Sequence, residues 1–130
     1  MSIRNLKTIL VLDAVTATGV FLVGLFAAAP AASLLGLPEQ VVAIGGWICL
    51  AAGLLMLIAA AQAVPNAALV KLIAVGNIGW VAASLGVVAA FSGTMTGLGI
   101  AVVIAQAVGV FVFAALEWKG AAVDGRALLV

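Results

Sequence analysis

Asp13 is the residue of this 130-residue chain whose type and position most directly indicate chemistry. It stands in a long apolar run, and counted from Leu6 along an α-helix it lies roughly 10 Å inside that run. A carboxyl group at such a depth in a bilayer costs several kcal/mol unless it is protonated, paired or open to water. Two interpretations stay open: a site for a proton or cation, or a hydrogen-bonded acid that holds helices together, with Lys71 as a conceivable partner.

Other polar side chains are expected near the same depth, so that they form one intramembrane layer. On a helix Asn77, Trp80 and Ser84 share one face, and the Trp80 indole N–H needs a partner that Asn77 or Ser84 could supply. Asn77 lies roughly 12 Å deep and Gln106 roughly 15 Å deep at the helical rise. The predicted layer consists of Asp13, Thr16, Asn77, Trp80, Ser84 and Gln106. The layer could bind a proton or a ligand, or it could provide interhelical hydrogen bonds alone.

Most familiar chemistries are missing from the sequence. The chain has no histidine and no tyrosine, and it contains no phosphate-binding loop, CxxC, HExxH or GxSxG motif. Its lone cysteine, Cys49, is expected to be a small buried apolar residue. Gln62 and Glu117 are placed at helix ends as ordinary interface residues, which leaves Asp13 as the one charged member of the layer. We therefore expect no enzymatic activity, no metal and no cofactor.

The composition requires a membrane to position these residues. Hydrophobic residues make up 68% of the chain and charged residues 7%, against about 45–50% and about 25% in soluble domains. Spans of about 20 apolar residues are predicted at residues 6–28, 41–63, 69–91 and 96–116, so residues 1–130 form a single transmembrane domain. Residues 30–36 begin with proline and end with glycine, which predicts a short helix in the membrane interface. The expected fold is all-α, an integral membrane four-helix bundle.

The basic residues predict the orientation of this bundle. With four spans, the N-terminus, the second loop and the C-terminus share one side of the membrane, and all five bases fall on that side: Arg4, Lys7, Lys71, Lys119 and Arg126. The positive-inside rule places that side in the cytoplasm. We expect an antiparallel up-down topology with both termini inside (N-in/C-in), in a bacterial inner membrane, and with Trp118 as an interface anchor.

Small residues at four-residue spacing predict where helices pack. Helices in lipid associate where small side chains let their backbones approach. One stripe lies in the third span (Ala82, Gly86, Ala90) and another in the fourth (Gly97, Ala101, Ala105, Gly109). Because only a short turn joins these spans, we expect the stripes to meet each other, or else to contact a partner.

Two segments carry a resemblance to known families. Residues 29–38, APAASLLGLP, and residues 76–84, GNIGWVAAS, resemble segments of small bacterial four-helix membrane proteins of the DoxX-like kind. That resemblance implies the four-helix fold and supplies no activity. The chain is also similar in length and span count to small multidrug resistance transporters, which have an acid early in the first helix, where this chain has Asp13. It departs from them in having aspartate rather than glutamate and in lacking their tyrosines.

Three functions are compatible with the sequence. The first is a non-enzymatic accessory or assembly subunit of a larger membrane complex, indicated by the sparse polar residues and the small-residue stripes. The second is a proton-coupled transporter or channel for a small solute, expected to be a homo-oligomer, that uses Asp13. The third is a bundle that binds an apolar ligand such as a quinone, pigment or lipid. The expected partners are the lipid bilayer and other membrane subunits or further copies of the chain, and with a net charge of +1 no nucleic acid is expected.

Overall fold

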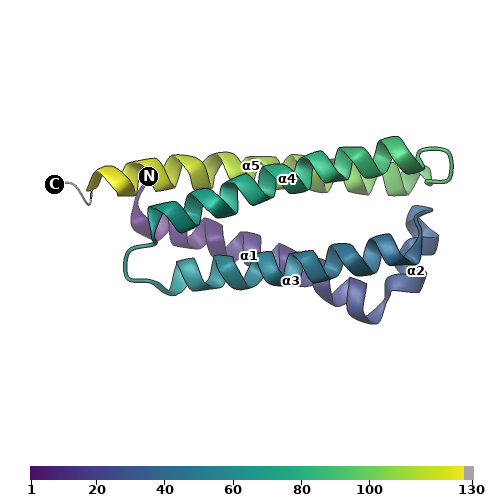
Figure 1. Ribbon diagram of the computed structural model, residues 1–130, viewed down its shortest axis with the longest axis horizontal. Helices are drawn as coiled ribbons and strands as arrows, with labels where there is room; N and C mark the ends of the chain where they lie inside the picture. The colour runs from purple at the N-terminus through teal and green to yellow at the C-terminus, as the bar shows by residue number, and fades with distance from the viewer. Residues whose placement is uncertain (128–130) are drawn as a thin grey trace.

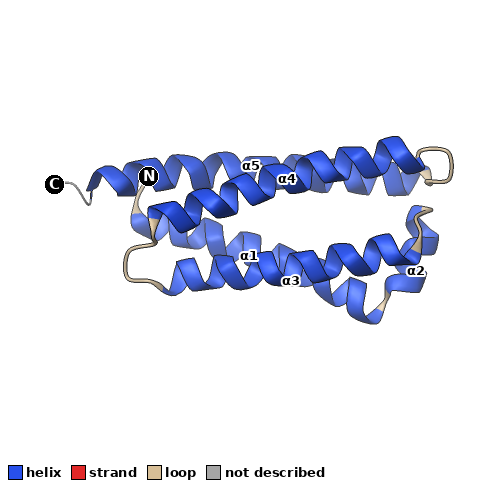
Figure 2. Ribbon diagram, viewed as in Figure 1, coloured by secondary structure: helices blue, strands red, loops and turns tan. Residues whose placement is uncertain are grey.

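The computed structural model describes the backbone of residues 1–127 and the side chains of residues 1–122, and every regular element in it is a helix (Figure 2). The helices are α1 (Ile3–Phe26), α2 (Ala28–Leu35), α3 (Glu39–Ala61), α4 (Ala67–Phe91) and α5 (Gly97–Ala127). Ser2 caps α1 and Asn66 caps α4, each by accepting a hydrogen bond from the backbone of the first turn. The all-α prediction is thus confirmed, and the short helix expected after the first span is α2.

Four of the described helices are long and apolar enough to cross a membrane. They are α1, α3, α4 and the Gly97–Ala122 part of α5, and at most 22% of each apolar window is buried inside the protein. Large apolar side chains such as Phe26 and Leu72 stay exposed, which is costly in water and favourable in lipid. The fold is therefore that of a multi-pass membrane protein.

The long helices form two pairs, α1 with α3 and α4 with α5 (Figure 1). The N-terminus and the C-terminal part of α5 lie at one end of the bundle, and α2 and the α4–α5 turn lie at the other. Contacts between the pairs are made mainly by α1 with α5, whereas α3 and α4 touch only sparsely. One side of the bundle is consequently less closed than the other.

Glycines bring α1 and α3 into close contact. A Cβ on Gly24 would lie 2.9 Å from the Val42 carbonyl oxygen and 3.1 Å from Gly46 Cα, so a side chain there would strike backbone. Further along the pair, Gly53 lies beside Ala17. These are the close backbone approaches by which helices associate in lipid, and the sequence prediction did not include them.

A cluster of apolar side chains fills the end of the bundle where the termini lie. Leu6 and Leu10 of α1 and Val70 of α4 are fully buried, and Met56 of α3 packs with them. Ala121 of α5 belongs to the same cluster, and its neighbour Gly120 lies directly against Leu6. Side chains from all four long helices therefore close this end.

The opposite end is closed by hydrogen bonds between two turns. Gly36 ends α2 in the left-handed conformation (φ 71°), which favours glycine, and its carbonyl accepts a hydrogen bond from Thr94 Oγ1 at 3.2 Å. The Thr96 side chain donates to the Leu34 carbonyl at 2.6 Å, and its backbone N–H donates to Leu35. These bonds attach α2 to the start of α5.

The two small-residue stripes do not meet. All seven residues are exposed: Ala82, Gly86 and Ala90 on α4, and Gly97, Ala101, Ala105 and Gly109 on α5. A Cβ added to Gly86 or Gly109 would find no atom within 4 Å. Two residues apart on a helix lie on roughly opposite faces, so burying Ser84 turns Ala82 outward. The expected contact within the helix pair is wrong, and the alternative contact with a partner stays a prediction.

The glycine contact of α1 with α3 yields a direct stability test. We expect Gly24→Ala to lower the free energy of unfolding by about 1–3 kcal/mol, because the added methyl group meets backbone atoms that cannot move aside. Gly86→Ala is the matched control, since that position has open space and alanine favours a helix. Unfolding in mixed micelles measures both variants. Equal stabilities for the two would contradict the packing described for α1 and α3.

Candidate functional site

Polar side chains from three helices meet at the side-chain nitrogen of Asn77. This nitrogen, Nδ2, donates one hydrogen bond to Asp13 Oδ2 at 2.7 Å and another to Glu117 Oε2 at 3.0 Å. Asp13 belongs to α1, Asn77 to α4 and Glu117 to α5, and all three side chains are buried. We call these three residues the carboxyl–amide cluster. It joins the α1–α3 pair to the α4–α5 pair.

The helical faces explain why these side chains converge. On α4 the buried positions include Ile73 and Asn77, and on α5 they include Ala114, Glu117 and Ala121, all at steps of three or four residues. Such spacing keeps the residues of each helix on one face. Lipid offers neither a carboxyl nor an amide group a hydrogen-bond partner, so the faces that carry them turn toward each other.

The cluster has more carboxyl oxygens than its one amide nitrogen can satisfy. Among the described side chains, Asn77 is the only N–H donor to either carboxyl group. Glu117 is 0% exposed, and its Oε1 has no hydrogen-bond partner in the described part of the chain. Two carboxyl groups beside one nitrogen would repel each other if both were charged, and burial strengthens that repulsion. The arrangement is suited to receive a positive charge, which could be a proton or a cationic group.

The expectation that Glu117 is an interface residue is wrong. The predicted fourth span ended at residue 116, but α5 continues to Ala127, so Glu117 lies within the helix rather than at its end. Its neighbours Trp118 and Lys119 are exposed, as an interface requires. Glu117 itself points inward to Asn77. The cluster therefore contains a second acid that the sequence reading excluded.

Gln106 belongs to a second polar group. Its Oε1 accepts a hydrogen bond from the Trp80 indole N–H at 2.7 Å, and its Nε2 donates to Ser84 Oγ at 2.9 Å and to the Val103 carbonyl at 2.8 Å. The partner predicted for Trp80 was Asn77 or Ser84, whereas the structure assigns Gln106. The single predicted layer is thus two groups, one around Asn77 and one around Gln106.

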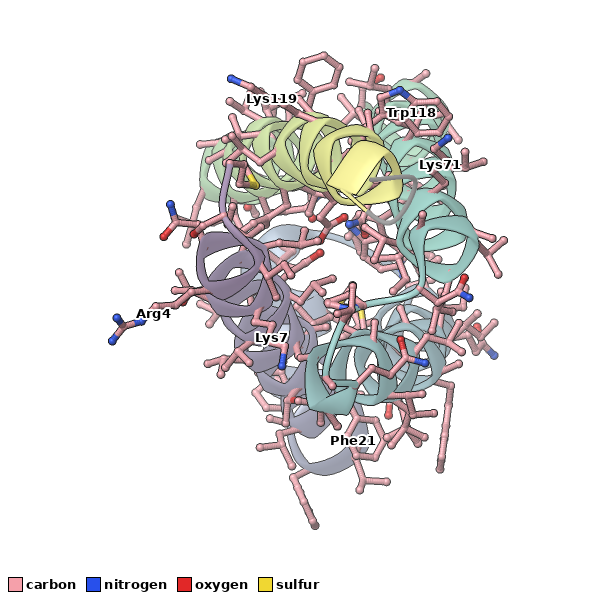
Figure 3. The ribbon with its side chains drawn as sticks, turned by 90° about the vertical axis from the view of Figure 1, so that its left-hand side faces the viewer. Arg4, Lys7, Phe21, Lys71, Trp118 and Lys119 are labelled. Atoms are coloured by element: carbon pink, nitrogen blue, oxygen red, sulfur yellow. The ribbon has the colours of Figure 1, made fainter. Side chains whose placement is uncertain are left out.

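The remaining predicted residues have other roles. Thr16 Oγ1 donates to the Asp13 backbone carbonyl at 2.8 Å, so Thr16 adds no bond to the carboxyl group. Lys71 does not reach Asp13; its Nζ lies 5.4 Å from the centroid of the Trp118 ring, as a cation–π pair (Figure 3). Gln62 ends α3, where its Oε1 accepts from the Asn66 backbone N–H at 2.8 Å. Among the described residues, no group of three or more potential metal ligands occurs.

A cavity of about 450 Å³ lies between the two helix pairs, next to both polar groups. Asp13, Asn77, Trp80 and Gln106 line it together with many apolar side chains from α1, α3, α4 and α5. Cys49 also lines it, so this cysteine is buried as expected but faces the cavity. Of the described side chains in the wall, Asp13 is the only carboxylate, and none is a lysine or an arginine.

Comparison with known proteins adds no family. The chain matches no protein-family model, no curated protein and no solved structure. The resemblance of its two segments to DoxX-like proteins stays a prediction. The fold and the site together define a small multi-pass membrane protein with a largely apolar cavity that has polar groups in its wall.

The carboxyl–amide cluster can be tested by removing its donor. Asn77→Leu keeps the side-chain size and removes the amide donor from both carboxyl groups, so we expect the free energy of unfolding to fall by about 3 kcal/mol. Asn5→Leu is the matched control, because Asn5 is exposed near the start of α1. Unfolding in mixed micelles gives both values. If Asn77→Leu lowers the free energy of unfolding no more than Asn5→Leu does, the cluster is not formed.

Proposed function

We propose that this protein binds an apolar small molecule within the membrane, in the cavity between its helix pairs. The cavity itself is the observation that carries the proposal. Its volume of about 450 Å³ lies in the range of about 300–1,000 Å³ that is usual for small-molecule sites. Its wall is mostly apolar with a few polar side chains, the composition that binds an apolar body and orients one polar group.

The rim of the cavity supports entry from the lipid. Ile48 on α3 and Leu72 and Gly76 on α4 line the cavity and are themselves exposed. They lie on the two helices that contact each other only sparsely. A hydrophobic ligand dissolved in the bilayer would therefore reach the polar groups sideways, between α3 and α4.

The orientation is part of the proposal. The described basic residues Arg4, Lys7, Lys71 and Lys119 come from the parts of α1, α4 and α5 that lie toward the end of the bundle seen in Figure 3. The side chain of Arg126 lies outside the described residues. By the positive-inside rule this end faces the cytoplasm, which gives an up-down bundle with both termini inside, in a bacterial inner membrane.

Two other functions keep support from particular observations. The paired acids Asp13 and Glu117 favour a proton-coupled transporter, because a buried carboxyl pair can exchange a proton for a cationic solute. The exposed small-residue stripes of α4 and α5 favour an accessory subunit, since such surfaces suit close helix contact with another subunit or a further copy. Either role is compatible with a ligand in the cavity.

Filling the cavity mouth tests the binding proposal. In nanodiscs, a decanol that carries a photoreactive diazirine should label cavity residues of the native protein, as mapped by mass spectrometry. Gly76→Phe places a ring at the rim and should reduce this labelling about tenfold, the effect of about 1.4 kcal/mol. Gly79→Phe is the matched control, because Gly79 is an equally open position of α4 outside the cavity wall.

The labelling pattern also shows how the binding proposal could fail. Labels spread evenly over the lipid-facing surfaces would contradict a cavity site. Equal labelling of the two phenylalanine variants at cavity residues would contradict entry past Gly76.

Proton coupling has its own test. If the protein transports a solute with protons, Asp13→Asn in proteoliposomes should abolish solute-linked proton movement, because the amide cannot take up or release a proton. Proton movement is measured with a pH-sensitive dye inside the vesicles, with candidate lipophilic solutes added outside. Unchanged proton movement in Asp13→Asn would remove Asp13 from any transport mechanism.

A further inference from the structure

The hydrogen-bond donors in the cavity wall are already used within the protein. Both N–H groups of Asn77 Nδ2 bind the two carboxyl groups. The Trp80 N–H binds Gln106, and both N–H groups of Gln106 Nε2 bind Ser84 and a backbone carbonyl. Thr16 donates to its own helix. Of the described side chains in the wall, only the weak donor of the Cys49 thiol is left for a ligand.

Several hydrogen-bond acceptors in the cavity wall, by contrast, have no N–H or hydroxyl donor in the described part of the protein. Asp13 Oδ1 and Asn77 Oδ1 accept no hydrogen bond from an N–H or hydroxyl group of the described residues, and both residues line the cavity. Within residues 1–122, Glu117 Oε1 is the only unpartnered side-chain atom that is completely enclosed, so the free oxygens of Asp13 and Asn77 retain some access. The polar wall therefore accepts hydrogen bonds and donates almost none.

We propose that the ligand has a cationic head that donates hydrogen bonds, such as a protonated amine, on an apolar body. This inference rests on the proposed ligand-binding function. Asp13 Oδ1 supplies the negative charge for the head, and Asn77 Oδ1 supplies a second acceptor. A charge-assisted hydrogen bond to a buried carboxylate is among the stronger contacts available to a ligand.

Two further features of the wall favour a cation. Glu117 stands behind Asn77 with an unpartnered buried oxygen, so the side chain behind the wall adds a further acceptor and no cation. Trp80 lines the same cavity with its N–H held by Gln106, and an indole ring in the wall attracts a cation that lies over its face. No lysine or arginine of the described wall competes with the ligand.

The same wall disfavours the other apolar ligands considered. A quinone presents carbonyl oxygens, which need donors, and a fatty acid presents a carboxylate, which Asp13 repels. A buried acceptor of the ligand that faces only protein acceptors is left without a hydrogen bond. The cavity should therefore rank ligands of equal chain length by their head groups.

This ranking can be measured with three probes that share a decyl chain. Decylammonium, decanoate and a decyl-substituted benzoquinone compete against the photoreactive decanol in nanodiscs of zwitterionic lipid. Protein-free nanodiscs give the membrane concentration of each competitor, so that partitioning is separated from binding. We expect decylammonium to compete at a membrane concentration about tenfold lower than either of the others.

Two carboxyl-to-amide variants locate the effect. Asp13→Asn should abolish the preference for decylammonium, because the charge is lost while the side-chain shape is kept. Glu39→Gln is the matched control, since Glu39 is exposed at the start of α3 and lies outside this cavity. It should keep the native preference. If Asp13→Asn does not fold, the ranking of the three probes on the native protein still tests whether the ligand is cationic.

The outcomes separate this inference from the function on which it rests. A labelled cavity that prefers the quinone or decanoate, or a preference that survives in Asp13→Asn, overturns the cationic ligand and leaves ligand binding intact. A cavity that takes up no photolabel overturns both. A tenfold preference for decylammonium that is lost only in Asp13→Asn supports both.

Discussion

The two hydrogen bonds that Asn77 donates, one to Asp13 and one to Glu117, are the constraint on which the arrangement of the helices depends. Two acids and an amide cannot be left facing lipid, where nothing would satisfy them. Their burial fixes the rotation of α1, α4 and α5 about their own axes. Once α4 presents Asn77 to the interior, its alanine and glycine stripe must face outward.

Packing between the helices is uneven, and the cavity follows from this. α1 and α3 approach closely at Gly24 and Gly46, where no side chain keeps the backbones apart. α3 and α4 have no such contact along their length. A bundle that is closed by apolar side chains at one end and by the Gly36–Thr94 turn contact at the other leaves space between these two helices. The polar groups stand in the wall of that space.

Composition was sufficient to predict the helical class and the number of apolar helices, because a bilayer leaves few alternatives to a helix of that length. Helical rise alone placed Asp13 and Asn77 at matching depths, and the structure joins them. The sequence did not predict Glu117 as a member of the cluster, because an acid beside Trp118 and Lys119 is typical of a helix end at the membrane interface. Only the continuation of α5 past this point shows that Glu117 lies within the helix. No local signal distinguishes these cases.

The helix contacts were harder to predict from sequence. In a chain rich in alanine, stripes such as the one through Gly97 and Ala101 occur on outer faces as readily as on inner ones. The true contact at Gly24 and Gly46 depends on two single glycines in different helices, and their juxtaposition is a tertiary property. The partner of Trp80 depended likewise on the rotation of α5, which brings Gln106 to it.

The most direct test of this account is a solid-state NMR measurement on the protein in lipid bilayers. With ¹⁵N in the Asn77 side chain and ¹³C in the aspartate and glutamate carboxyl groups, the dipolar couplings report which carboxyl carbons lie beside the amide nitrogen. The account predicts couplings from Asn77 to both Asp13 and Glu117, each consistent with a direct hydrogen bond. Coupling to Asp13 alone, with the Glu117 carboxyl group accessible to water, would contradict it.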